Sequence, residues 1–376
     1  MVSWKNILGG LLFPVLLSYG TSGSAQGTLQ ERIDPSGIES TIENADEYSL
    51  KSVLDLEATF LDFDTARADS MADVLSERFY SSVADMPLES PEDAISMSEK
   101  LLAEFDDYFD TGDYQPLSLS LEKIADDSTY QSPASCVRIS LLYSDVFTRY
   151  LDEHPESKVS VSVVNVGSES NYHALTRFDF PSGETVYFDQ NGSTPTTPEE
   201  LYEKYDVSEH AIDNDIFLQP RSTSENLAEE VNSHVSTYES SLPQNHIRML
   251  GRIANEVDPD NVPFNYNHGL TLVEDGDYAG AKELAGRILD DDTASVTGKM
   301  LMSKATYEAG EYDEAIHWSK SVLHRDPHNF SAMHVLGMSY VESGDEKSAR
   351  EYGEKLRKKR SYYHRKLAQE IYRLIE

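Results

Sequence analysis

Apolar residues after position 50 recur at steps of three and four, which is the spacing of one face of a helix. One such series is Met97, Leu101, Phe105 and Phe109. Ser90-Pro91 precedes it and is typical of a helix start, because proline suits the first helical position. We expect a helical lead-in of two to four helices over residues 49–125. Residues 26–48 are polar and contain the breaker PSG at 35–37, so we expect a flexible linker there.

The pattern changes to alternation beyond residue 157. The segment KVSVSVVNV (158–166) alternates valine with polar residues, as a half-buried strand does. YHALTRFDF (172–180) and TVYFDQ (185–190) follow, separated by a Pro-Ser-Gly turn, and together they indicate a hairpin. We therefore expect an α+β core over residues 126–222, in which a helix packs on an antiparallel sheet.

The last third of the chain repeats with a period of 34 residues. The columns that carry the period are Gly276, Gly310 and Gly344, and Ala281, Ala315 and Ala349. Glycine suits the end of a first helix and alanine suits its closest contact with a second, so the pattern resembles tetratricopeptide repeats. The resemblance implies an all-α repeat solenoid over residues 261–376 that ends in a capping helix, Tyr362–Ile375. Residues 223–260 are expected to form a degenerate helical repeat.

The N-terminus has the three-part layout of a secretory signal peptide. A short start with one positive side chain leads into the apolar run Ile7–Leu17, and small residues follow up to a plausible cleavage site after Ala25. We expect a signal peptide over residues 1–25 and export to a periplasmic or extracellular location. A short uncleaved anchor is the alternative. No later stretch approaches the length of a membrane span, so we expect no integral membrane segment.

The charge of the chain is strongly acidic. It contains 31 Lys and Arg against 67 Asp and Glu, a formal net charge of −36. A phosphate backbone would be repelled, so nucleic acid is not expected as a partner. Residues 347–376 differ, because they hold ten Lys and Arg and four Glu. This basic C-terminal segment is expected either to be a solvated last helix or to dock on an acidic surface.

A single cysteine, Cys136, precludes an internal disulfide. It is therefore a buried small hydrophobe, an intermolecular link or a reactive thiol. Ser132 suits a helix N-cap and Pro133 a first helical position, so we expect a helix over about 133–151 with Cys136 in its first turn. Backbone N–H groups and the helix dipole at that end favour an anion, and the thiolate is the nucleophilic form of cysteine.

The hairpin brings a base and a carboxylate into register. A three-residue loop with Gly183 in the left-handed conformation would pair Phe180 with Glu184. His173 and Asp189 would then be diagonal neighbours on one face of the sheet, within side-chain reach. A four-residue loop would place them on opposite faces. In the first register, the residues fit the arrangement of a nucleophile, a base and a group that orients the base.

SCVRISLLYSDVFTRYL, NYHALTRF and VYFDQNGS, ahead of LYEKYDVSE, resemble bacterial proteins that join a helical lead-in, a transglutaminase-like core and tetratricopeptide repeats. The core of that family is similar to papain-type cysteine proteases in its active-site layout. The resemblance implies that Cys136 is the nucleophile, His173 the base and Asp189 its orienting group. Gln131 and Tyr130, just upstream, are the candidate oxyanion donors. The implied reaction is hydrolysis of an amide or peptide, or acyl transfer, through a thioester.

No metal or cofactor is expected, because the sequence contains no HExxH, CxxC, calcium-loop or phosphate-binding glycine pattern. The alternative to an enzyme is an adaptor in which Cys136 is a packed thiol, His173 is structural and Asp189 is a turn acid. In both cases the repeats are expected to bind a protein or peptide. The candidate partner-binding residues are Asn265, Asn267, His268, Lys299, Met302, Met333 and His334.

Overall fold

The computed structural model describes residues 28–29, 35–111, 115–126, 131–167, 173–189, 197–205, 207, 209–213, 217–238, 243–359 and 361–375. The expected signal peptide, residues 1–25, lies outside them. The described residues fall into two compact units, of which one ends at Val257 and the other begins at Asp258. Each unit is described by itself.

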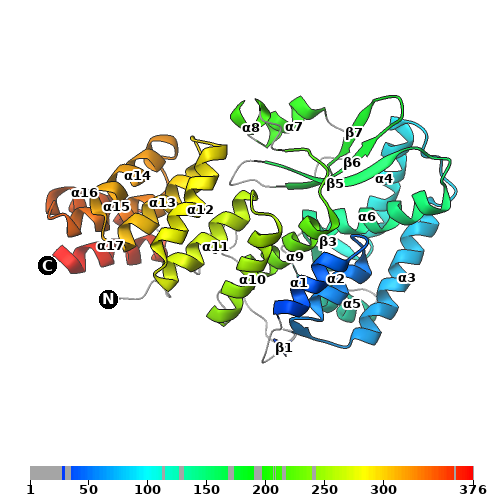
Figure 1. Ribbon diagram of the computed structural model, residues 1–376, viewed down its shortest axis with the longest axis horizontal. Coiled ribbons are helices and arrows are strands. Elements are labelled where there is room, and N and C mark those ends of the chain that lie inside the picture. The colour runs from blue at the N-terminus through cyan, green and yellow to red at the C-terminus, as the bar shows by residue number, and fades with distance from the viewer. Residues whose placement is uncertain are drawn as a thin grey trace. The chain divides into compact units, whose positions relative to one another are not determined.

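Helices dominate the N-terminal unit (Figure 1). They are α1 (Pro35–Asn44), α2 (Leu50–Glu57), α3 (Thr65–Val83), α4 (Pro91–Phe105), α5 (Leu117–Asp126), α6 (Cys136–Glu153), α7 (Pro198–Lys204), α8 (Glu209–Asp213), α9 (Thr223–Tyr238) and α10 (Gln244–Val257). Two short ladders join parts of this unit: β1 (Thr28–Leu29) pairs antiparallel with β2 (Leu61–Asp62), and β3 (Phe109–Thr111) pairs parallel with β4 (Ser132–Ala134). The helical lead-in is therefore present, and it begins earlier than the sequence indicated.

Two of these helices show how the sequence specifies them. α4 begins with a capping box between Ser90 and Asp93 and has proline in its first turn, as its sequence predicted. α1 was expected to be part of a flexible linker. It is a helix because Ile38 and Ile42, four residues apart, are both fully buried and anchor one face.

The predicted hairpin is present with the predicted register. β5 (Ser160–Val166), β6 (His173–Asp179) and β7 (Thr185–Phe188) form an antiparallel sheet in the order β5-β6-β7. The N–H of Phe180 donates to the carbonyl of Glu184 over 2.9 Å, which closes the three-residue loop. Gly183 has φ +88°, a left-handed conformation that glycine adopts without steric cost.

The two faces of this sheet are covered by different segments (Figure 1). α6 covers one face, where Tyr143 packs on Phe188 and Phe147 packs edge-on against Phe178. The other face carries an apolar cluster that includes residues of α7. Its members are Val164, Val166, Leu175, Tyr187, Leu201, Tyr205 and Leu218. The sheet is therefore buried on both sides.

The expected fold class is wrong. Strands β5, β6 and β7 have only seven, seven and four residues, and the sheet they form is the largest in the described part of the chain. The protein is mostly helical, which fits a helical repeat region but not a transglutaminase-like α+β core. The sheet does not extend past β5, because the N–H groups of Leu218 and Arg221 donate to the carbonyls of Asn165 and Val163 and cover that edge.

The C-terminal unit is an array of helix pairs. Its helices are α11 (Val262–Asp275), α12 (Tyr278–Asp291), α13 (Val296–Glu308), α14 (Tyr312–Arg325), α15 (Phe330–Glu342), α16 (Glu346–Arg357) and α17 (Tyr362–Ile375). The first helices of successive pairs begin 34 residues apart, and so do the second helices, as the period in the sequence predicted. The last helix has the bounds predicted for a cap. α9 and α10, expected as a degenerate repeat, cluster with the N-terminal unit instead.

The small-residue columns of the array have the predicted roles. Gly276, Gly310 and Gly344 all have φ between +80° and +81°, at the end of a first helix. A Cβ on Gly269 would lie 2.4 Å from Cδ2 of Leu301 in the next first helix, and Ala281, Ala315 and Ala349 are fully buried. Side-chain size at Gly269 and in the alanine column therefore limits how closely the helices approach, whereas the other three glycines provide the left-handed conformation.

Candidate active site

The start of α6 is fixed by the segment before it. The N–H of Ser132 donates to the carbonyl of Tyr108 over 2.8 Å, and β4 continues the parallel ladder with β3. Ser132 is therefore a strand residue and not the expected N-cap. Ser135 caps the helix, with its hydroxyl accepting from the N–H of Arg138, so Cys136 is the first helical residue. The predicted position of the thiol at a helix start is confirmed, although the helix begins three residues later than expected.

The three predicted catalytic residues converge. His173, at the start of β6, forms a side-chain hydrogen bond with Cys136. Its Nε2 lies 3.0 Å from Oδ1 of Asp189, which directly follows β7. His173 is 4 % exposed and Asp189 is fully buried, whereas Cys136 is half-buried. The imidazole thus lies between a sealed carboxylate and a partly accessible sulfur.

Two further residues contact Asp189. Nζ of Lys204 donates to Oδ2 of the carboxylate over 2.6 Å, and the hydroxyl of Tyr205 donates to the same oxygen over 2.7 Å. The Tyr205 ring also stacks on the His173 ring, with centroids 5.0 Å apart and planes 15° apart. Each carboxylate oxygen of Asp189 is therefore used, one by the imidazole and one by these two donors.

These contacts set the charge state of the His173–Asp189 pair. Burial lowers the pKa of His173, but hydrogen bonds with Asp189 and Cys136 outweigh burial and raise the pKa to about 9. Burial raises the pKa of Asp189, but hydrogen bonds from His173, Lys204 and Tyr205 hold that pKa well below its usual range. At neutral pH the pair is an imidazolium–carboxylate pair next to the thiol.

A buried ion cluster lies two residues into the same helix. Nη2 of Arg138, which is 2 % exposed, lies 3.7 Å from Oε1 of Glu57 and 3.4 Å from Oε2 of Glu230. Glu57 also accepts from the N–H groups of Leu117 and Ser118 at the start of α5. Burial raises the pKa of Glu57, and Arg138 and the backbone hydrogen bonds oppose that rise. The cluster ties α2, α5 and α9 to the first turn of α6.

Of the two expected oxyanion donors, Gln131 is engaged away from the thiol. Gln131 is exposed, and its Nε2 donates to the carbonyl of Asp106. Tyr130 lies outside the described residues. Backbone N–H groups in the first turn of α6 are candidate oxyanion donors at this end, because first-turn N–H groups of a helix point along its axis without intrahelical acceptors.

Three of the seven candidate partner-binding residues of the repeats are internal. Nδ2 of Asn265, a 1 % exposed residue, donates to the carbonyls of Pro259 and Asn261. His334 is 2 % exposed and its Nε2 lies 3.1 Å from Oε2 of Glu370. Met333 belongs to the core between the last helices. Asn267, His268, Lys299 and Met302 are half-buried. Asn265, Met333 and His334 therefore contribute to packing. Their positions within the 34-residue repeat did not show whether they are buried or exposed.

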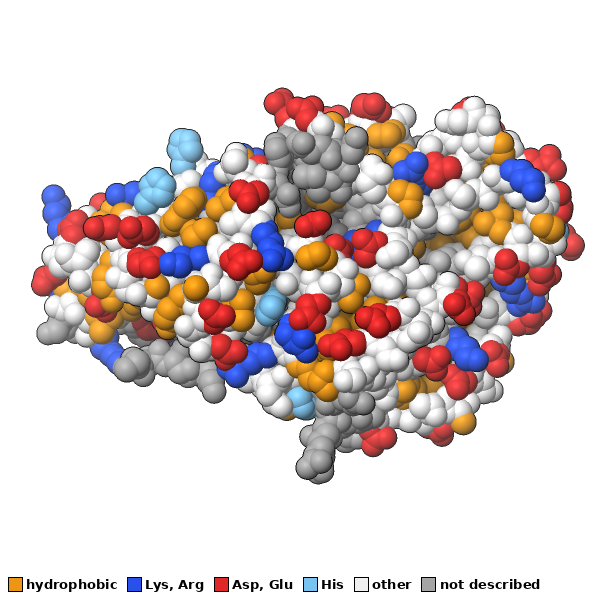
Figure 2. All heavy atoms as spheres, viewed as in Figure 1, with side chains coloured by type: hydrophobic (Ala, Val, Ile, Leu, Met, Phe, Trp, Pro, Cys, Tyr) orange, Lys and Arg blue, Asp and Glu red, His pale blue; other side chains and the backbone are white. Residues whose placement is uncertain are grey.

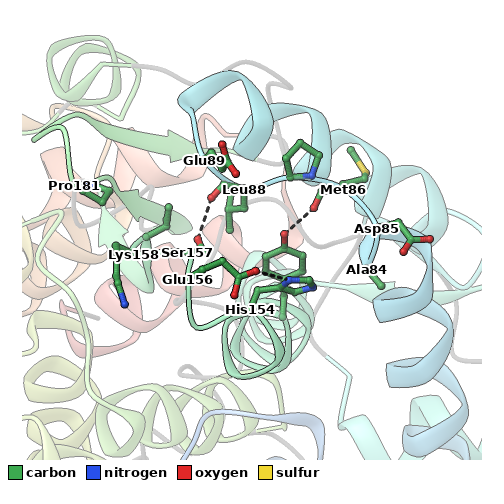
Figure 3. A pocket seen from close by; sticks show the side chains of 13 residues that line it. Ala84, Asp85, Met86, Leu88, Glu89, His154, Glu156, Ser157, Lys158 and Pro181 are labelled. Carbon is green, nitrogen blue, oxygen red and sulfur yellow. Dashed lines mark hydrogen bonds and ion pairs between the residues drawn. The ribbon is translucent and has the colours of Figure 1, made fainter.

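A pocket of about 640 Å³ lies elsewhere in the same unit (Figure 3). Its lining includes Tyr150 and His154, at the C-terminal end of α6, which is about 25 Å from Cys136 at 1.5 Å per helical residue. The hydroxyl of Tyr150 donates to the carbonyl of Met86, and that of Ser157 donates to the carbonyl of Leu88. Its polar groups thus join the segments that line it, and the pocket is separate from the thiol.

Sequence reasoning missed Lys204, Tyr205 and Arg138. Lys204 and Tyr205 end a short helix whose capping box, Thr197 to Glu200, is visible in the sequence. Nothing local shows that this helix end reaches Asp189. Arg138 shares a helix face with the buried Leu141 and Leu142, so a polar residue on a core face was the available signal.

Comparisons with models of known protein families and with curated proteins found no match for this chain. Within the part of the chain that the structure describes, no helix combines the length and apolarity needed to cross a bilayer. Asp and Glu are spread over the face shown in Figure 2. In the basic C-terminal segment, Lys355 and Arg357 pair with Glu351 and Glu354 of the same helix.

Proposed function

We propose that this protein is a cysteine-dependent enzyme that attacks the carbonyl of an amide or a related acyl compound, with Cys136 as nucleophile, His173 as acid and base, and Asp189 as orienting group. The observation that carries the proposal is the position of His173, which is hydrogen-bonded to Cys136 on one side and to a buried carboxylate on the other. The proposal does not depend on a transglutaminase-like fold.

The chemistry follows from the charges at the site. A protonated His173 and the start of α6 both stabilise a thiolate at Cys136. The thiolate attacks the carbonyl carbon, a C–S bond forms, and the carbonyl electron pair moves to oxygen. When the tetrahedral intermediate collapses, the C–N bond breaks and the leaving amine takes the proton of His173. A thioester remains on Cys136.

The second half uses the neutral imidazole. His173 takes a proton from water or from an acceptor amine, which then attacks the thioester carbon. The C–S bond breaks, and the sulfur leaves as a thiolate next to the newly protonated His173. Hydrolysis results when water attacks, and acyl transfer results when an amine does. Asp189 keeps the imidazole oriented and stabilises its charged form throughout.

The rate of iodoacetamide alkylation tests the site without knowledge of the substrate, because Cys136 is the only cysteine. We expect alkylation at pH 7 about ten times faster than that of a free cysteine, and about tenfold slower in His173→Ala. His154→Ala, at the other end of α6, is the matched control and should react as the wild type does. A Cys136 no more reactive than free cysteine, or unaffected by His173→Ala, would contradict the proposal.

A second measurement addresses the acyl step. Incubation with p-nitrophenyl acetate should release a burst of nitrophenolate and leave one acetyl group on Cys136, detected by intact-mass and peptide mass spectrometry. Cys136→Ser should show neither. An acetyl group found on lysines alone, at the same rate in both proteins, would argue for a site that does not transfer acyl groups.

The second candidate function is a protein-binding adaptor, favoured by the regular array of helix pairs from α11 to α17. We propose that this array binds a protein or peptide, whether or not the thiol is catalytic, and that the protein acts outside the cytoplasm. A pull-down with Cys136→Ala as bait would retain both a substrate and a repeat-bound partner. Recovery of the same partners by a Cys136→Ala,His173→Ala bait would favour the adaptor.

A further inference from the structure

α7 and residues after it cover the sheet face on which His173 and Asp189 lie. Leu201 of α7 is fully buried, and Tyr205 and Leu218 are 4 % and 3 % exposed in the same apolar cluster as Leu175. We call α7, Tyr205 and residues 217–221 the cover segment. Figure 1 shows α7 on the side of the sheet away from α6, which carries the thiol.

The cover segment contains a residue with a strained backbone conformation. Leu218 has φ +64°, a conformation that residues with a Cβ rarely adopt. Its N–H donates to the carbonyl of Asn165, and its carbonyl accepts from Nη1 of Arg177 over 2.8 Å. A strained residue persists only where its surroundings hold it, here through both backbone groups and a buried side chain. The segment is therefore firmly seated.

The seated segment delivers two donors to one oxygen of Asp189. Lys204 and Tyr205 both contact Oδ2, while Oδ1 faces His173. A carboxylate with partners on one oxygen alone can rotate about its last torsion, and donors on the other oxygen prevent that. The Tyr205 ring also covers one face of the imidazole.

We propose that Lys204 and Tyr205 are positioning residues, through which the cover segment fixes the orientation and the shared charge of the His173–Asp189 pair. Their donors draw negative charge toward Oδ2, which limits how strongly Asp189 binds the proton of His173. The role of this arrangement in catalysis rests on the proposed function. The effect of Lys204 and Tyr205 on the His173–Asp189 pair does not depend on it.

Among the described residues, the titratable side chains that act on His173 or Asp189 include Cys136 from α6, and Lys204 and Tyr205 from the cover segment. Further along β6, Arg177 is paired with Asp179 over 2.8 Å. A change in the titration of His173 on removal of Lys204 or the Tyr205 hydroxyl is therefore assigned to the shared carboxylate.

The test uses Lys204→Met and Tyr205→Phe in the full chain. Both substitutions are mild, because Lys204 is 39 % exposed at its side chain and phenylalanine keeps the stacked ring. The readout is the titration of the His173 ring by NMR, with its resonance identified by its absence in His173→Gln. We expect each variant to move the titration upward by about half a pH unit, and both together by more.

Lys158→Met is the matched control, since Nζ of that lysine donates to the carbonyl of Pro155 and its side chain lines the separate pocket. The inference is overturned if the two variants titrate as the wild type does, or if Lys158→Met moves the titration equally. The alkaline limb of the Cys136 alkylation profile should shift with the NMR titration. If the rate of Cys136 alkylation does not depend on His173 in the wild type or in any variant, the proposed function fails, while the NMR titration still decides this inference.

Discussion

The pH dependence of stability follows from the pair that His173 forms with Asp189. The pKa of His173 rises from 6.5 to about 9 in the folded protein. A raised folded pKa stabilises the fold fully below the unfolded value, and that stability is lost as pH rises through the folded value. At 1.36 kcal/mol for each unit, the raised pKa of His173, to which Asp189 and Cys136 both contribute, adds about 3 kcal/mol of stability below pH 6.5, which disappears by about pH 9.5.

Asp189→Asn removes the charge and keeps the shape. Burial then opposes only the contribution of Cys136, so the folded pKa of His173 should fall from about 9 and the dependence of stability on pH should weaken. The difference in unfolding free energy between the wild type and the variant should therefore be largest near pH 6. It should shrink by up to about 3 kcal/mol as the pH rises to 9.5.

The assay must report the N-terminal unit alone, because the chain has two compact units. Urea titrations at each pH, followed by pulsed hydrogen exchange and mass spectrometry of peptides from β6, meet this need. Asp152→Asn, an exposed residue of α6, is the matched control and should keep the wild-type dependence. A pH-independent difference between the wild type and Asp189→Asn, or a His173 ring that titrates near 6.5 in the wild type, would refute the reasoning.

Three other substitutions probe the fold that holds the site. Arg138→Met leaves Glu57 and Glu230 buried without their cation and should cost about 3–5 kcal/mol in the same urea assay; wild-type stability would show that the carboxylates are neutral there. Gly183→Ala, at φ +88° in open space, should cost about 1 kcal/mol and lower the melting temperature, whereas Ser182→Ala should not. In Gly269→Ala the new Cβ lies 2.4 Å from Leu301, so the substitution should destabilise the repeat unit by about 1–3 kcal/mol. In Gly286→Ala the new Cβ meets nothing within 4 Å in mid-helix, so the substitution should stabilise that unit by up to about 1 kcal/mol. The reverse order of stability would contradict the packing described.

Local patterns were sufficient for the hairpin and the repeats. The period of two along 173–179 and 185–188 and a glycine at the turn specify one register, and that register alone puts His173 and Asp189 on one face. The 34-residue columns likewise specify the helix pairs, because small residues are needed where backbones approach closely. In both cases the information lies within a short stretch of chain.

Contacts between distant segments were not predictable. Ser132 is an ordinary N-cap residue by sequence, but pairing with β3, more than twenty residues upstream, makes it a strand residue. Lys204 and Tyr205 reach Asp189 only because Leu201 and Leu218 dock on the sheet. The expected α+β core was wrong for the same reason, since alternation located three strands but could not show that a loop backbone closes the edge of β5.

The buried carboxylate of Glu57 has a consequence for how such a chain can be rearranged by recombination. It joins the end of α2, the start of α5 and the guanidinium of Arg138 in the first turn of α6, so the opening helices and the start of α6 with Cys136 must be inherited together. Homologues should therefore keep α2, α5, α6 and α9 as a block, because Arg138 also reaches Glu230 of α9.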